Sequence, residues 1–223
     1  MGQDQVFIGV ELQHAWRLYT LAALDANLKL LALHQGRLSE VVAYLAENHP
    51  VLAAICAPLK PNRGRMQREE IRAGLFSALP GNHSAEMRQV EYELLSRGLP
   101  APRTPPVGNF TPAWMRRGQK LVQELTNLGY AQFSEAETRN QLIETCPEAI
   151  FTSLLGHTPF PADALEGRIQ RQLVLWDNRL PVRDPMTFFE EVTRHKLLRG
   201  ILPDQAILPI AQLNALAAAH AAY

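Results

Sequence analysis

A single carboxylate interrupts the first apolar stretch of the chain. Residues 6–12 are almost continuously apolar, as expected of a central strand covered on both faces, and Glu11 is the one charged residue among them. An unpaired carboxylate inside a sheet is unfavourable, so a buried Glu11 needs a partner, a metal ion or a proton. Glu11 is therefore either a metal ligand or a strand-end glutamate that points into water.

Basic side chains occur in two groups with spacing suited to phosphate contacts. Lys60, Arg63 and Arg65 lie in a turn that also contains proline and glycine, and Arg168 and Arg171 lie one turn apart on a predicted helix. Both groups have the charge needed to hold a nucleic-acid backbone. The alternative for the turn is simple solvation, because two glutamates follow it closely, and for the helical pair it is surface salt bridging.

Composition restricts the protein to ordinary globular classes. The 223 residues contain 22 basic and 22 acidic side chains, which argues against a general polyanion binder but allows a local basic groove. Cys56 and Cys146 form no Cys-x-x-Cys pair, a pattern that suits a reducing compartment and excludes a thiolate-rich zinc site. We expect a cytoplasmic protein that does not enter a membrane, because neither a signal peptide nor an apolar run of roughly 18 residues is present.

The hydrophobic pattern predicts an α/β architecture. Apolar runs at 6–12, 16–24 and 28–33 are joined by short polar links, which indicates an antiparallel three-strand meander. A helical stripe that ends at Pro50 and a buried run at 51–56 then predict a crossover to a parallel strand. This fourth strand could lie on the open side of the first.

The rest of the chain is predicted to be mainly helical and to belong to one domain, residues 1–223. Residues 60–112 are irregular, with short helices near 71–79 and 86–97, and are interpreted as an insertion over one end of the sheet. The remaining predicted elements are a helix at 112–128, a fifth strand at 141–145, a helix that begins at 147, and helices at 163–178, 185–199 and 209–222.

This order of elements is that of the ribonuclease H-like fold, and several phrases resemble an uncharacterised family of predicted ribonuclease H-like nucleases. The phrases are Phe-Ile-Gly-Val-Glu at 7–11, Ala-Ala-Ile-Cys-Ala-Pro-Leu at 53–59, Arg-Gln-Val-Glu at 88–91, Glu-Thr-Cys-Pro-Glu-Ala at 144–149 and Asn-Ala-Leu-Ala-Ala-Ala at 214–219. The resemblance implies a mixed five-stranded sheet, made of the meander plus parallel strands, with flanking helices and a helical insertion.

The resemblance also implies a metal-dependent hydrolase that cleaves nucleic-acid phosphodiesters. Such enzymes use two divalent ions, Mg²⁺ or Mn²⁺, about 4 Å apart, to stabilise the attacking and leaving oxygens. Hard carboxylate oxygens must then converge at one end of the central strands. The candidates in this chain are Glu11, Glu91, Glu144 and Glu148, with Glu11 and Glu144 as the expected metal ligands.

Three positions depart from the acidic pattern of that family, which has aspartates there. Glu11 is one methylene longer than an aspartate, Cys56 offers a soft sulfur and is better interpreted as a small buried hydrophobe, and Asn214 carries no charge. Two hypotheses follow: a metal-dependent nuclease with an altered site, or a catalytically silent scaffold that binds nucleic acid or a protein partner.

The two hypotheses predict different geometries. A nuclease requires carboxylates within metal-bridging distance of one another, whereas a silent scaffold is indicated by an apolar pocket around Cys56 with the glutamates splayed apart. The alanine-rich segment at 215–222 packs either in the core or against a second chain, which leaves a homo-oligomer open.

Overall fold

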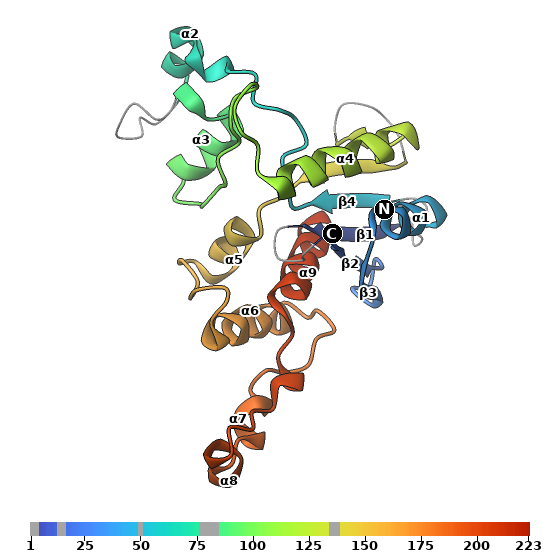
Figure 1. The fold of residues 1–223 in the computed structure, drawn as a ribbon, viewed down its shortest axis with the longest axis vertical. Coiled ribbons are helices and arrows are strands. Elements are labelled where there is room, and N and C mark those ends of the chain that lie inside the picture. Colours follow the sequence, from blue (N-terminus) through green and yellow to red (C-terminus); the bar gives the residue numbers. More distant parts are fainter. Residues whose placement is uncertain (1–4, 13–16, 49–50, 76–84, 134–138) are drawn as a thin grey trace.

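The protein is built on a mixed six-stranded sheet with the strand order β3-β2-β1-β4-β6-β5 (Figure 1). The computed structural model describes residues 5–12, 17–48, 51–75, 85–133 and 139–223. The strands are β1 (Val6–Glu11), β2 (Tyr19–Leu24), β3 (Leu30–Gly36), β4 (Val51–Ile55), β5 (Ala131–Gln132) and β6 (Gln141–Glu144). Strands β1, β2 and β3 form the predicted antiparallel meander, and β4 pairs parallel with β1 on its open side, as expected.

Two of the meander strands begin later than the apolar runs that predict them, and β3 extends beyond its run to Gly36. Residue 16 lies outside the described residues, and Arg17 has a positive φ of 58°, so β2 starts only at Tyr19. Leu28 also has a positive φ, 60°, which places it in the turn and delays β3 to Leu30. The turn is held by Asp25, whose side chain accepts hydrogen bonds from the backbone of Asn27 and Lys29, both at 2.8 Å.

The sheet has one strand more than predicted. The expected fifth strand is β6, which pairs parallel with β4, and β5 adds a short parallel pairing at the outer edge. Strand β5 was missed because two residues are too few to show an alternating apolar pattern.

The described part of the chain contains nine α-helices. They are α1 (Leu38–Glu47), α2 (Glu69–Ala73), α3 (Gln89–Ser96), α4 (Ala113–Asn127), α5 (Pro147–Leu155), α6 (Leu165–Asp177), α7 (Thr187–Glu191), α8 (Arg194–Leu198) and α9 (Ile210–Ala222). Helices α1 and α4 cover one face of the sheet and α9 covers the other, with α5 and α6 packed beside it. Among the described residues, no helix is both long and apolar enough to cross a bilayer.

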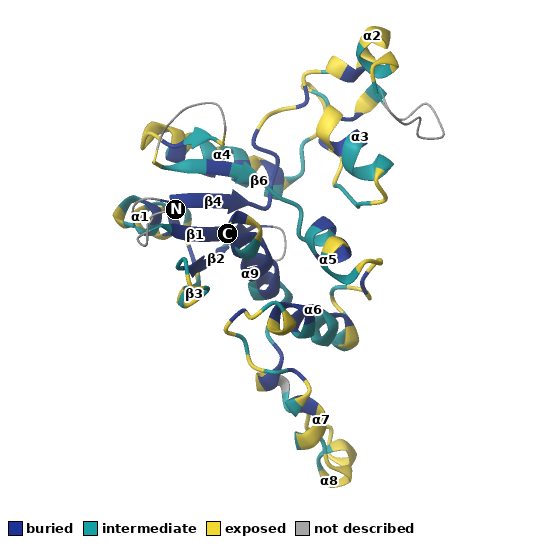
Figure 2. Ribbon diagram, turned by 180° about the vertical axis from the view of Figure 1, so that it is seen from behind, coloured by how far each residue is buried: buried dark blue, intermediate teal, exposed yellow. Residues whose placement is uncertain are grey.

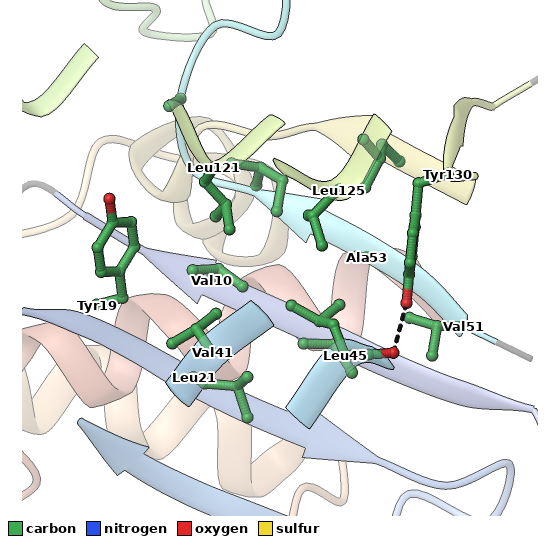
Figure 3. Packing of buried hydrophobic residues seen from close by; sticks show 14 of the residues in the cluster. Val10, Tyr19, Leu21, Val41, Leu45, Val51, Ala53, Leu121, Leu125 and Tyr130 are labelled. Carbon is green, nitrogen blue, oxygen red and sulfur yellow. Dashed lines mark hydrogen bonds between the residues drawn. The ribbon is translucent and has the colours of Figure 1, made fainter. Parts of the chain in front are cut away.

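The face under α1 and α4 holds a layered apolar core (Figure 3). Val10 and Leu21 of the sheet meet Val41 of α1 and Leu121 of α4 in one buried cluster. Tyr130 closes this cluster by donating its hydroxyl to the carbonyl of Leu45, at 2.8 Å. The buried hydroxyl thus satisfies its hydrogen-bonding need and links the end of α4 to α1.

The opposite face depends on a very close approach between α9 and β1. A Cβ atom at Gly9 would collide with the backbone of Ala215 and Ala219, so only glycine fits at this point of the strand. Small alanine side chains let the helix lie this near the sheet. The alanine-rich segment therefore packs in the core of its own chain, which is the first of the two alternatives left open by the sequence.

Two segments extend from opposite ends of this core (Figures 1 and 2). The insertion, residues 60–112, is tied together by buried Asn62, which donates to the carbonyls of Glu86 and Thr104 at 2.6 and 2.8 Å. Its first helix ends at Ala73 rather than near 79, and residues 76–84 lie outside the described part. The second segment, residues 184–203, is called the arm below.

The arm corrects the prediction of a single helix at 185–199. The structure has two short helices, because Val192 adopts an extended ψ of 114° between them. The side chain of Thr193 then caps α8 by accepting a hydrogen bond from the backbone of Lys196, at 3.2 Å. A local capping signal thus outweighs the continuous helical pattern.

Candidate functional site

A cavity of about 330 Å³ opens at the carboxyl ends of β4 and β6. Its volume is at the lower end of the range of roughly 300–1,000 Å³ typical of ligand sites. Carboxyl ends of parallel strands are the usual binding edge of open α/β sheets. We call this cavity the cleft; its lining includes Cys56, Val90, Trp114, Glu144 and Glu148.

Three residues lie side by side at the carboxyl ends of β1, β4 and β6. The backbone of Cys56 donates to Val10 at 2.9 Å, and that of Thr145 donates to Ile55 at 3.0 Å, which extends the sheet register by one residue. Glu11, Cys56 and Thr145 therefore follow one another across the ends of β1, β4 and β6. The sulfur of Cys56 is 3.7 Å from the hydroxyl of Thr145.

The middle member of this row is a neutral thiol. Burial raises the pKa of Cys56 well above its usual value, and the negative charge of Glu11 raises it further. Cys56 therefore stays protonated at neutral pH. It packs in the apolar cluster with Leu52 and Ala54, in agreement with its interpretation as a small buried hydrophobe.

Arg88, whose side chain is 11% exposed, connects two of the predicted site glutamates. Arg88 donates from Nη1 to Glu144 at 2.8 Å, from Nη2 to the second Glu144 oxygen, and from Nε to Glu91 at 2.7 Å. Glu144 also accepts from the backbone of Leu59, at 2.9 Å. One guanidinium thus brings together a residue from the insertion and a residue from the end of β6.

The proline-rich loop of the insertion also donates hydrogen bonds to Glu91. Both the backbone (3.1 Å) and the hydroxyl of Thr104 donate to the Glu91 oxygen that faces Arg88. Burial by itself lowers the pKa of Arg88, but hydrogen bonds to Glu144 and Glu91, and their charges, outweigh burial and raise this pKa. The positive charge of Arg88 is therefore permanent.

Glu148 belongs to a separate ion pair. Arg171 of α6 donates from Nη2 to both Glu148 oxygens, at 2.9 and 2.8 Å, and from Nη1 to the carbonyls of Phe160 and Gly167. Its guanidinium also lies over the ring of Phe151, 5.3 Å from the centroid. The pair fastens the start of α5 to α6.

The donor set, as arranged, does not fit a divalent cation. Magnesium and manganese require carboxylate oxygens that converge on one point. Here Glu91 and Glu144 bind Arg88, Glu148 binds Arg171, and Glu11 lies beside the neutral thiol of Cys56. In the part of the chain that the structure describes, no three His, Cys, Asp or Glu residues are grouped so as to hold a metal ion.

The predicted phosphate-binding residues fall into different environments. Lys60, Arg63 and Arg65 are exposed on the insertion, so a phosphate contact there stays a prediction. Arg168 is half-buried, and its Nε lacks a hydrogen-bond partner among the described residues. Arg171 is almost fully buried and engaged with Glu148, so it would have to exchange partners to reach a phosphate.

Arg88 and the apolar cleft wall are the features that the candidate residues did not include. The sequence contains one signal for Arg88, since it precedes Glu91 by three residues at the start of a helix, a spacing that favours an ion pair. Its contact with Glu144 spans 56 residues and has no local signal. The wall residues Val90 and Trp114 come from α3 and α4, two elements joined by the irregular loop.

Comparison of the chain with models of protein families, with curated proteins and with solved structures gives no match.

Proposed function

We propose that this protein is a catalytically silent ribonuclease H-like scaffold whose cleft binds a protein partner. The order of an antiparallel meander followed by parallel strands supports the fold assignment, together with the position of the cleft at the carboxyl ends of β4 and β6. The observation that carries the proposal is Arg88. Its guanidinium lies between Glu91 and Glu144, in the role that a metal ion has in a nuclease.

The charges exposed in the cleft favour a protein over a nucleic acid. The side chain of Arg88 is 11% exposed, whereas those of Glu144 and Glu148 are 26% and 40% exposed. Arg88 and Arg171 pair with these carboxylates, but three glutamates, Glu91, Glu144 and Glu148, face only two arginines, so an incoming group meets a net negative charge, which repels phosphates and attracts basic side chains. Apolar side chains such as Val90 and Trp114 supply the remaining wall, as in pockets that hold the side chains of a partner.

Both cysteines carry free thiols, which supports a reducing compartment such as the cytoplasm.

The alternative function is the metal-dependent nuclease, in which Glu11 and Glu144 hold Mg²⁺ or Mn²⁺. It requires Glu144 to leave Arg88, at the expense of a bidentate ion pair.

Calorimetric titration with Mn²⁺ distinguishes the two functions. The wild-type protein is expected to give no saturable binding at millimolar metal. Arg88→Met, which frees two carboxylates, is expected to gain Mn²⁺ binding, whereas Arg88→Lys keeps a cation in place and serves as the matched control. Circular dichroism spectra establish that each variant is folded.

Two results would contradict the proposal. One is saturable Mn²⁺ binding by the wild-type protein that Glu11→Gln abolishes, accompanied by cleavage of single- or double-stranded nucleic acid. The other is a folded Arg88→Met protein that binds no metal, because Arg88 would then not be standing in for a cation.

A further inference from the structure

The outer part of the arm carries large apolar side chains that stay exposed among the described residues. At the base of the arm, Phe188 of α7 is buried with Ala206 and Ile207. Beyond it lies α8, all of which is described, and none of its residues is buried. Leu198 is 78% exposed, and Leu197 and Ile201 beside it are also exposed (Figure 2). A contiguous exposed group of large apolar side chains marks a contact surface.

The same segment is strongly basic. Residues 193–203 contain Arg194, Lys196 and Arg199 and no acidic residue. Arg194 and Arg199 are exposed alongside Leu198. The segment therefore presents apolar and positively charged side chains together.

The cleft has the complementary character. Val90, on the wall formed by α3, is an exposed apolar residue, and Trp114 and prolines of the insertion line the same cavity. The most exposed charged groups of the cleft are the carboxylates of Glu144 and Glu148. An apolar wall bordered by carboxylates matches an apolar helix bordered by basic side chains, and such complementarity selects partners and their orientation.

We propose that α8 of one copy of this chain docks in the cleft of a second copy. Leucine side chains of α8 pack on the wall that includes Val90, and its basic side chains lie near Glu148. This inference rests on the proposed function of the cleft as a protein-binding site, and it names the partner. Reciprocal exchange of arms between two copies buries both contacts and gives a closed dimer.

The arm is better placed to reach the cleft of a second copy than the cleft of its own chain. Figures 1 and 2 both show α8 extended away from the sheet, while the cleft lies between α3, the start of α4 and α5. Phe188 anchors the base of the arm in a buried cluster with Ala206 and Ile207. An exchange between two copies keeps that anchor in place.

Sedimentation velocity over a concentration series tests the inference with three variants. Leu198→Glu alters the arm, and Val90→Lys places a positive charge in the cleft; both positions are exposed, so folding is expected to be preserved. Leu31→Glu is the control, because Leu31 is an exposed leucine on the edge strand β3, which three strands separate from β6. Wild type and Leu31→Glu are expected to self-associate, and the other two variants to associate at least about tenfold more weakly.

Mixing the two defective variants gives a sharper result. Val90→Lys retains an intact arm and Leu198→Glu retains an intact cleft, so an equimolar mixture is expected to form a heterodimer through one contact. Each variant alone is expected to remain monomeric at the same total concentration.

Three outcomes would overturn the inference: a wild-type protein that is monomeric throughout, a Val90→Lys protein that associates like wild type, or a mixture that stays monomeric. Binding of monomeric wild type to vesicles containing anionic lipid, abolished by Leu198→Glu, would assign the arm to a membrane instead. Failure of the silent-scaffold proposal appears separately, as Mn²⁺ binding by the wild-type protein, and leaves the sedimentation result interpretable.

Discussion

Two arginines pair with glutamates that line the cleft, and the surroundings of the two pairs differ. Arg88 lies between two carboxylates, one of which, Glu91, is only 2% exposed. Arg171 is itself only 1% exposed, but its partner Glu148 reaches water. In the first pair Glu91 is buried and Arg88 is nearly so, at 11% exposed, whereas in the second the cation alone is buried.

The difference predicts that the effect of removing one partner depends on the charge that remains, through its exposure to water and its other hydrogen-bond partners. A charge left buried after its partner is removed has neither water nor a counterion, and the loss is large. A charge that reaches water is solvated instead, and the loss is small. The exposed pair Arg183–Glu191 on the arm is the limiting case, so the three pairs form a graded series.

Arg88→Met is expected to have the largest effect, a loss of about 3–5 kcal/mol in the free energy of unfolding. It leaves Glu91 buried with the donors of Thr104 and no cation. Urea denaturation followed by circular dichroism measures the change. Arg88→Lys should lose less, because it keeps the charge but not the forked geometry. A loss below about 1 kcal/mol for Arg88→Met would show that both charges are already well solvated.

Glu148→Ala is expected to destabilise the protein by about 1.5–3 kcal/mol, the usual range for hydrogen bonds to charged groups. Buried Arg171 keeps its two carbonyl acceptors, which limits the loss. Glu166→Ala is the matched control, because Glu166 is exposed and also lies in the first turn of a helix. Equal losses for the two variants in urea denaturation would mean that the helix dipole, and not Arg171, accounts for the effect.

The neutral thiol of Cys56, which lies beside the buried Glu11, extends the comparison to a group without a counterion. Burial and Glu11 raise the pKa of the Cys56 thiol in the folded protein, while in the unfolded chain it is near 8.5. The unfolded chain therefore releases a proton that the folded protein retains. Below about pH 8.5 this thiol has no effect on stability, and above it stability falls by up to about 1.4 kcal/mol per pH unit.

The pH dependence can be assigned to Cys56 by substitution. Urea denaturation of wild type and Cys56→Ala at neutral pH and near pH 10 should show a smaller alkaline loss in the variant. Cys146 and Tyr130 also have raised pKa values, so part of the loss should remain. An identical alkaline loss in both proteins would place a titrating thiol elsewhere than at position 56.

Arg183→Met is expected to have the smallest effect, a loss of about 0–1 kcal/mol. Arg183 and Glu191 are 49% and 40% exposed, so both are solvated without each other. The same urea denaturation measurement applies. A loss as large as that of Glu148→Ala would break the relation between burial and ion-pair energy drawn from the cleft.

The sequence was sufficient for the part of the fold that local patterns determine. Apolar runs with turn residues between them predicted the meander, and the apolar run after Pro50 predicted a parallel strand beside β1. Such patterns fail where tertiary contacts or caps decide, as at the two-residue strand β5 and at Thr193, which divides the predicted helix at 185–199.

The candidate site could be predicted only in position. Glu11, Glu144 and Glu148 do lie at the carboxyl end of the sheet, because strand ends collect there. Their partners were not predictable, since Arg88 reaches Glu144 only after the insertion folds over β4. The chemical character of the site therefore depends on the contact between Arg88 and Glu144, two residues far apart in the chain, and the sequence alone does not indicate that contact.

The close approach at Gly9 has a consequence for the order in which the protein is made. The helix that covers this glycine is synthesised about 200 residues after it, when β1 and its neighbours have long left the ribosome. Until then, the apolar face of the sheet that α9 covers lacks this helix. Chaperone dependence of newly made chains, and sensitivity to premature stop codons before residue 210, are the expected biological signs of that delay.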